Sequence, residues 1–143
     1  MFQIQFGAAE VEILIKLVLA ALFGLIIGFE RRARNYGLGS RTSMLVCIGA
    51  CLFTIGATYG GDVTGLGRVA QGLATGVGFI GAAIIWRQPQ NPVVVHGLTS
   101  AVAVWVLTAI GFALGAGAYA AAVLVTFGVL IILLVRHFKY KYG

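Results

Sequence analysis

Charged residues are scarce in this sequence. They make up 10% of the 143 residues, whereas hydrophobic residues make up 60%. A soluble domain carries about 25% charged residues, so this composition excludes an ordinary soluble protein. The mean hydropathy of +1.01 is typical of a chain that lies mostly in lipid. We therefore expect an integral membrane protein in which residues 1–143 form a single domain.

Acidic residues and cysteines are also few, and their placement argues against catalysis. The acids are Glu10, Glu12, Glu30 and Asp62. They fall at segment ends or in a connection, whereas ion-coupled carriers usually place ionisable groups deep in the membrane. Cys47 and Cys51 lie four residues apart in an apolar run, without the further ligands that a zinc site needs. We expect two buried apolar cysteines, no enzyme activity and no cofactor.

Apolar residues gather into five segments, which are residues 11–29, 43–59, 69–86, 98–114 and 118–135. Each approaches the length of about 20 residues with which a helix crosses a hydrocarbon core of about 30 Å. Backbone groups in lipid must be hydrogen-bonded internally, so these segments should be helices. The predicted fold is an all-α bundle of five transmembrane helices. The short connection at Gly115–Gly117 leaves a re-entrant or interfacial arrangement of the last two segments as an alternative.

The basic residues predict the orientation of this bundle. They concentrate in the first connection, the third connection and the tail, and they are Arg31, Arg32, Arg34, Arg41, Arg87, Arg136, Lys139 and Lys141. The second connection holds only Arg68, and no positive charge precedes the first apolar segment as it would in a cleaved signal. By the positive-inside rule, the N-terminus lies outside and the C-terminus in the cytoplasm of a bacterial inner membrane. The basic clusters would contact anionic lipids, and we do not expect nucleic acid as a partner.

Three glycine pairs are spaced for close helix packing: Gly24 with Gly28, Gly72 with Gly76, and Gly111 with Gly115. Small residues four apart let helix backbones approach each other in lipid. We expect them to pack the bundle internally, with a dimer interface as the alternative.

Polar residues inside the segments are the remaining candidates for a site. Glu12 and Lys16 are spaced for an ion pair on one helix. On the third segment Gln71, Thr75 and Gly78 share a face, beside Gly76. On the fourth, Thr99, Ser100 and Thr108 are the corresponding hydroxyl residues. These two faces could line a narrow cavity or could hydrogen-bond to each other.

Several sequence blocks, in order and spacing, resemble the MgtC/SapB family over about residues 12–120. The blocks are Gly24-Leu-Ile-Ile-Gly-Phe-Glu-Arg31, Gly39-Ser-Arg-Thr42, Met44-Leu-Val-Cys-Ile-Gly-Ala50, Arg68-Val-Ala-Gln71, Gly76-Val-Gly-Phe-Ile-Gly-Ala82 and Gly97-Leu-Thr-Ser-Ala101 ahead of Trp105. The chain departs from the family pattern in having Arg32 where a second acid is usual and Ser40 where leucine is usual. It also stops soon after its fifth segment, where many members continue into a soluble domain.

The resemblance implies an inner-membrane protein linked to magnesium homeostasis, which would act by binding other membrane proteins as the best-known members of the family do. Our first hypothesis is a membrane-embedded regulator with a cytoplasmic polar patch. In it Glu30 would pair with Arg41 beside Thr42, while Arg31 and Arg34 would contact lipid or a partner. The alternative is a transporter or channel for Mg²⁺ or another cation, in which several copies of Glu30 meet in a homo-oligomer and bind the ion. Magnesium would then be a transported or sensed ion, because it prefers oxygen ligands.

Overall fold

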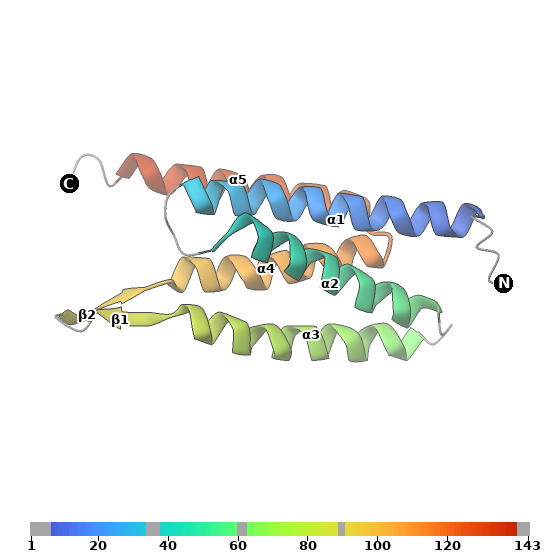
Figure 1. The fold of residues 1–143 in the computed structure, drawn as a ribbon, viewed down its shortest axis with the longest axis horizontal. Coiled ribbons are helices and arrows are strands. Elements are labelled where there is room, and N and C mark those ends of the chain that lie inside the picture. The colour runs from blue at the N-terminus through green and yellow to red at the C-terminus, as the bar shows by residue number, and fades with distance from the viewer. Residues whose placement is uncertain (1–6, 34–37, 60–62, 89–90, 140–143) are drawn as a thin grey trace.

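The computed structural model describes residues 7–33, 38–59, 63–88 and 91–139 (Figure 1). Its elements in chain order are α1 (Ala8–Ala33), α2 (Ser40–Tyr59), α3 (Val63–Ile84), β1 (Trp86–Gln88), β2 (Asn91–His96), α4 (Leu98–Gly115) and α5 (Tyr119–Lys139). The helices run roughly along one long axis, and α1 begins at the end of the bundle opposite to the end of α5 (Figure 1). The prediction of five helices is confirmed.

The helix bounds differ most from the prediction at α3. It begins at Val63 rather than at residue 69 and ends at Ile84. Hydropathy identifies only the apolar part of a helix. The first turns of α3 contain glycines and Arg68, so hydropathy placed the start of the helix too late. The third connection, for which the sequence indicated no secondary structure, contains two strands. Strands β1 and β2 pair antiparallel as a hairpin, with Trp86 opposite His96 and their rings stacked at 4.5 Å.

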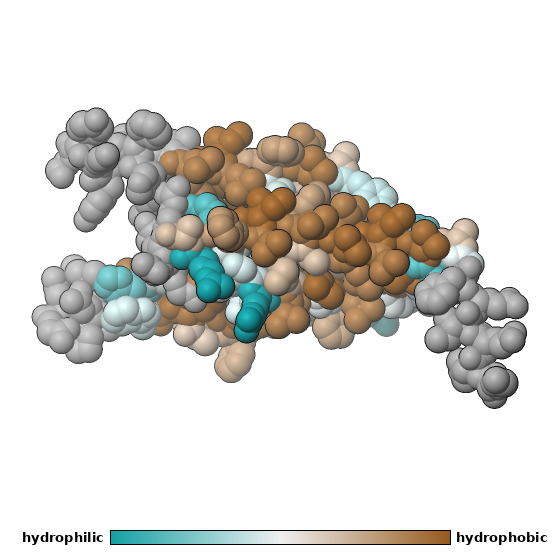
Figure 2. All heavy atoms as spheres, turned by 45° about the horizontal axis from the view of Figure 1, so that its top comes forward, coloured by the Kyte–Doolittle hydropathy of each residue, from teal (hydrophilic) through white to brown (hydrophobic). Residues whose placement is uncertain are grey.

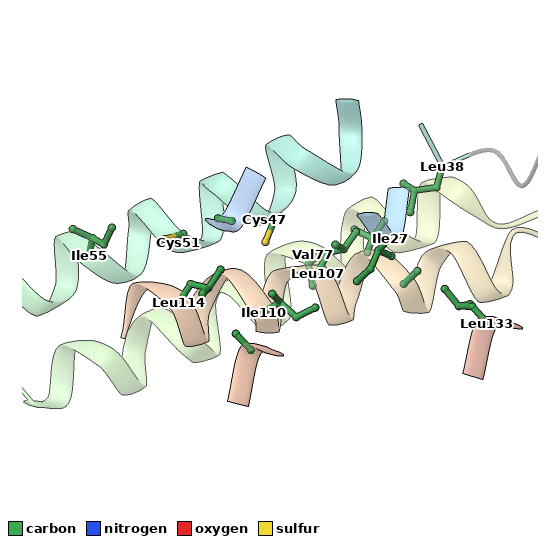
Figure 3. Close-up of a cluster of buried hydrophobic side chains, with 14 residues drawn as sticks. Ile27, Leu38, Cys47, Cys51, Ile55, Val77, Leu107, Ile110, Leu114 and Leu133 are labelled. Carbon is green, nitrogen blue, oxygen red and sulfur yellow. The ribbon is translucent and has the colours of Figure 1, made fainter. Parts of the chain in front are cut away.

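Helix α4 lies at the centre of the bundle and packs against each of the other four helices. Its side chains Leu107, Ile110 and Leu114 are buried in the core (Figure 3). Cys47 and Cys51 of α2 lie in the same cluster, both as free and fully buried thiols. The prediction that the cysteines act as buried apolar side chains is confirmed.

Two of the three glycine pairs bring backbones together inside the bundle. A Cβ on Gly24 would lie 2.8 Å from the Met44 Cα of α2, and one on Gly28 would lie 2.8 Å from the Ser40 Cα. A Cβ on Gly111 would overlap the Cys47 carbonyl, and one on Gly115 would lie 2.6 Å from the Cys51 carbonyl oxygen. Helix α2 is therefore in backbone contact with α1 on one side and with α4 on the other.

The third pair, on α3, behaves differently. A Cβ on Gly72 or on Gly76 would meet nothing within 4 Å, so neither glycine packs the bundle as we had predicted. The polar faces of α3 and α4, for which we had left open a shared cavity or mutual hydrogen bonds, lie in different surroundings. Thr75 donates its hydroxyl to the Gln71 carbonyl on an exposed face, while Thr108 is buried and donates to the Val104 carbonyl. Helix α3 meets α4 through its opposite face, where Gly81 lies against Ala101.

Length and composition suit several helices to a membrane. Helices α1, α2 and α4 are long and apolar enough to cross one, and α5 has a shorter apolar stretch, Tyr119–Leu134. On the face drawn in Figure 2 hydrophobic side chains cover most of the surface, and the most hydrophilic ones gather in the half nearer the hairpin end.

Candidate functional site at the hairpin end of the bundle

Buried charge lies at the end of the bundle where α1 ends, α2 and α4 begin and the hairpin projects (Figure 1). Arg31 in the last turn of α1 is 4% exposed. Its guanidinium donates a hydrogen bond of 3.1 Å from one terminal nitrogen to the hydroxyl of Ser100 in α4. Ser100 is 1% exposed. A buried arginine in a membrane protein is costly and marks a functional site by default.

Glu30 is the acidic neighbour of this arginine. One of its carboxylate oxygens lies 4.0 Å from a terminal nitrogen of Arg31, and the two side chains are 11% and 5% exposed. Opposite charges this close stabilise each other strongly where water is excluded. The site is therefore a compact polar cluster that joins α1 to α4.

Glycines and serines of α1 and α2 shape the wall of the cluster. A Cβ added to Gly28 would lie 2.6 Å from the Ser43 hydroxyl oxygen, so only glycine lets α2 approach α1 this closely. Ser43 is fully buried and donates its hydroxyl to the Gly39 carbonyl at 3.1 Å. Ser40, also buried, begins α2 beside it. This packing closes α1 and α2 against each other and leaves Arg31 directed at α4.

Gly97 places Ser100 in the first turn of α4. It has a φ of 85°, and a Cβ there would collide with the Ile84 carbonyl at the end of α3. A left-handed backbone of this kind favours glycine. The Gly97 carbonyl then accepts the first hydrogen bond of α4, from the Ala101 amide at 2.8 Å. The hairpin can therefore return to the bundle in a turn that sets Ser100 opposite Arg31.

The predicted polar patch is only partly gathered here. Glu30 and Arg31 belong to the cluster, but Arg31 is buried against Ser100 rather than exposed to lipid. Arg41 and Thr42 are exposed in the first turn of α2, and the structure records Arg31 rather than Arg41 within ion-pair distance of Glu30. Arg34 lies outside the described residues.

Sequence reasoning missed the roles of Arg31, Ser40 and Ser43, although one signal was available. Arg31 stands three residues after Gly28 and seven after Gly24, so all three share one face of a helix. The glycines mark that face as the one that packs, and Arg31 follows it into the interior.

Among the described residues, the surroundings of Glu30 are a poor fit to a resident magnesium ion. In the part of the chain that the structure describes, no three His, Cys, Asp or Glu residues come together. A single carboxylate beside the positive guanidinium of Arg31 is a poor ligand set for a divalent cation, which needs several oxygens and little positive charge nearby.

The opposite end of the bundle carries a simpler polar arrangement. Lys16 and Glu12 form the predicted ion pair at 2.8 Å, with side chains 14% and 60% exposed. This confirms their pairing on α1. A shallow pocket of about 210 Å³ lies nearby, lined by Ala9, Glu12, Ile13, Thr58 and Tyr59.

Comparison with known proteins identifies the family. The sequence profile of the MgtC family matches residues 17–141. This chain belongs to the MgtC family. The chain is 41% identical over 134 residues to "Putative magnesium transporter YhiD" of Escherichia coli K12, an overlap that covers 88% of this chain and 61% of the relative. No solved structure matches the chain.

Two further relatives are more distant. Protein SapB of Bacillus subtilis is 34% identical over 116 residues, which cover 76% of this chain and 49% of SapB. Protein MgtC of Brucella abortus is 37% identical over 107 residues, which cover 75% of this chain and 44% of MgtC. The chain therefore spans less than two thirds of the length of these MgtC-family relatives.

Proposed function

We propose that this chain is a membrane-embedded regulator of magnesium homeostasis that acts by binding other membrane proteins. It would lie in the bacterial inner membrane as five spanning helices, with the hairpin end and its basic residues on the cytoplasmic side. Membership of the family, and the reference to magnesium in the name of the E. coli relative, support the link to magnesium. Membrane lipids would be its other partners.

The packed interior of the bundle carries this proposal. Buried hydroxyls of Thr54, Thr108 and Thr126 each donate to a carbonyl of their own helix, at 2.8, 3.0 and 2.7 Å. Glycine contacts press α2 onto both α1 and α4, which leaves little space between their backbones. An ion crossing the membrane needs oxygens or water to replace its hydration shell. Among the described residues, these groups do not converge on such a path.

A transporter remains the second candidate, because the name of the E. coli relative points to transport. It would require a path between several copies of the chain rather than through one. The exposed polar face of α3, which includes Gln71 and Thr75, is the surface that could contribute to such a path.

Magnesium influx into liposomes separates the two candidates. We expect purified protein in liposomes that hold a magnesium-sensitive dye to give no influx above empty liposomes, both for the wild type and for Glu30→Ala. An ionophore added at the end checks the dye, and circular dichroism checks that the helices are folded. Influx that needs the protein and falls in Glu30→Ala would overturn the regulator and place Glu30 on a transport path.

Capture of partners tests the regulatory role directly. We expect chemical cross-linking in magnesium-starved cells to recover a membrane protein with the wild type. Arg32 and Arg41 are exposed and can contact a partner. The double substitution Arg32→Ala with Arg41→Ala should therefore reduce the amount of membrane protein recovered. Leu124→Ala, at an exposed apolar position of α5, serves as the matched control and should not. Recovery of no membrane protein at all would contradict the proposal.

A further inference from the structure

One face of α3 is exposed and does not suit lipid. Its residues follow the spacing i, i+3, i+4, i+7, i+8 and i+11, so they form a straight stripe along the helix. We call this the outer stripe, and it consists of Arg68, Gln71, Gly72, Thr75, Gly76 and Phe79, all exposed. Val77 on the other side of the helix is buried against the bundle. Phe79 is 82% exposed.

The polar part of the outer stripe falls at mid-helix. Helix α3 has 22 residues, so it is about 33 Å long at 1.5 Å per residue. Gln71 lies about 12 Å from its start and Thr75 about 18 Å. In the membrane placement proposed above, on which this inference rests, both would lie near the middle of the bilayer. A side-chain amide there needs a hydrogen-bonding partner that lipid tails cannot supply.

Other exposed surfaces of the bundle differ from the outer stripe. Helix α1 exposes Leu14, Val18 and Leu22, and α5 exposes Leu124, Phe127 and Ile131. These are large apolar side chains that suit lipid. Helix α3 lies at the edge of the bundle, where it packs against α4 and α2 (Figure 1), yet it exposes Gln71 and Thr75 between its two ends. A helix at the edge should be more apolar than one at the centre unless protein covers it.

We propose that the outer stripe is the interface through which two copies of this chain form a symmetric dimer in the membrane. All copies insert with the same orientation, so a two-fold axis along the membrane normal sets each residue of α3 opposite its own counterpart. The amide of Gln71 both donates and accepts hydrogen bonds, so it can pair with the Gln71 of the second copy. This self-complementarity favours a second copy over an unrelated protein.

The glycines allow the close approach that this pairing needs. Gly72 and Gly76 have the small-xxx-small spacing, and a Cβ on either would meet nothing within 4 Å in one copy. Such pairs support right-handed crossings at about −40°. The crossing point lies at the two glycines, next to Gln71 and Thr75. The two helices diverge towards Arg68, which keeps the two positive charges apart, and Phe79 packs on the other side of the crossing.

Energy transfer between donor-labelled and acceptor-labelled copies in liposomes measures the fraction of the protein that is dimeric. Varying the protein-to-lipid ratio gives the strength of dimerisation. We expect a dimer that Gly76→Leu weakens by roughly tenfold and Gln71→Leu by a few-fold. Gly128→Leu is the matched control, because Gly128 on α5 also faces open space. It should leave dimerisation unchanged. An added Cβ at Gly76 or Gly128 would meet nothing within 4 Å, and Gln71 is exposed, so the variants should fold.

Cysteine cross-linking locates the interface. Gly72→Cys should form a disulfide between copies under mild oxidation, whereas Leu124→Cys and the wild type, with its two buried cysteines, should not. A monomer at every protein-to-lipid ratio, or a dimer linked through Leu124→Cys, would overturn the inference. Labelling of Thr75→Cys by a membrane-impermeant maleimide identifies the cause. If no dimer is found and the Thr75→Cys variant is protected from the maleimide, only the dimer proposal is wrong. If no dimer is found and this variant is labelled rapidly, the proposed membrane placement is wrong as well.

Discussion

Replacing Gly111 with alanine tests the backbone contact between α4 and α2. The new Cβ would overlap the Cys47 carbonyl and lie 2.9 Å from the Ala50 Cβ. Since the carbonyl is part of a helix, it cannot move without shifting α2, and overpacking of this kind costs about 1–3 kcal/mol. The gain in helix propensity from glycine to alanine is about 1 kcal/mol. We expect Gly111→Ala to lower the free energy of unfolding by up to about 2 kcal/mol, and to be about 1–3 kcal/mol less stable than a glycine-to-alanine change in open space.

Gly128→Ala is the control for this prediction, because its Cβ would meet nothing within 4 Å. It should keep the gain in propensity, up to about 1 kcal/mol, without the steric cost. Unfolding in mixed micelles with increasing SDS, followed by circular dichroism, measures both variants under identical conditions. Equal unfolding free energies for Gly111→Ala and Gly128→Ala would refute the claim that the two backbones are in contact.

The remaining predictions concern the polar groups and the turn into α4, with the same unfolding assay. Ser100→Ala removes a hydrogen bond to a buried guanidinium and should cost about 1.5–3 kcal/mol, whereas Thr108→Val removes a neutral bond within one helix and should cost about 0.5–1.5 kcal/mol. The reverse order would contradict the importance assigned to the cluster. Gly97→Ala should cost at least about 2 kcal/mol, because it adds a collision with the Ile84 carbonyl to a left-handed backbone. A smaller loss would mean that this turn can relax. Glu12→Gln should change stability by less than about 0.5 kcal/mol, because Glu12 is 60% exposed. A large loss there would show that the ion pair is desolvated by lipid.

The sequence predicted the features that depend on local spacing. Apolar segments marked five helices, and a spacing of four residues identified the Glu12–Lys16 pair. Burial of Cys47 and Cys51 followed from their apolar surroundings. These properties depend on neighbours along one helix, which the sequence lists in order.

Features that depend on how a helix is rotated in the bundle were not predicted. Periodicity correctly placed Gln71 and Thr75 on one face of α3 but could not tell whether that face points at α4 or away from it. The pairing of Glu30 with Arg41 was expected because both lie at helix ends on the same side of the bundle, yet it is Arg31, on the packed face of α1, that lies within ion-pair distance of Glu30. The hairpin was missed because its strands are short and follow a helix directly.

The distribution of polar groups indicates where function should be sought. Between α1, α2 and α4 the glycines bring backbones into contact, and the buried threonines are bonded within their own helices. Such an interior is stiff and has few free polar groups with which to handle an ion. Arg31 and Glu30 join α1 to α4 at one end, and Gln71 faces outwards on α3. Among the described residues, the polar chemistry that this bundle can offer to another molecule therefore lies at its hairpin end, at the Glu12–Lys16 end and on the outer surface of α3. This distribution supports the proposed role through neighbours in the membrane.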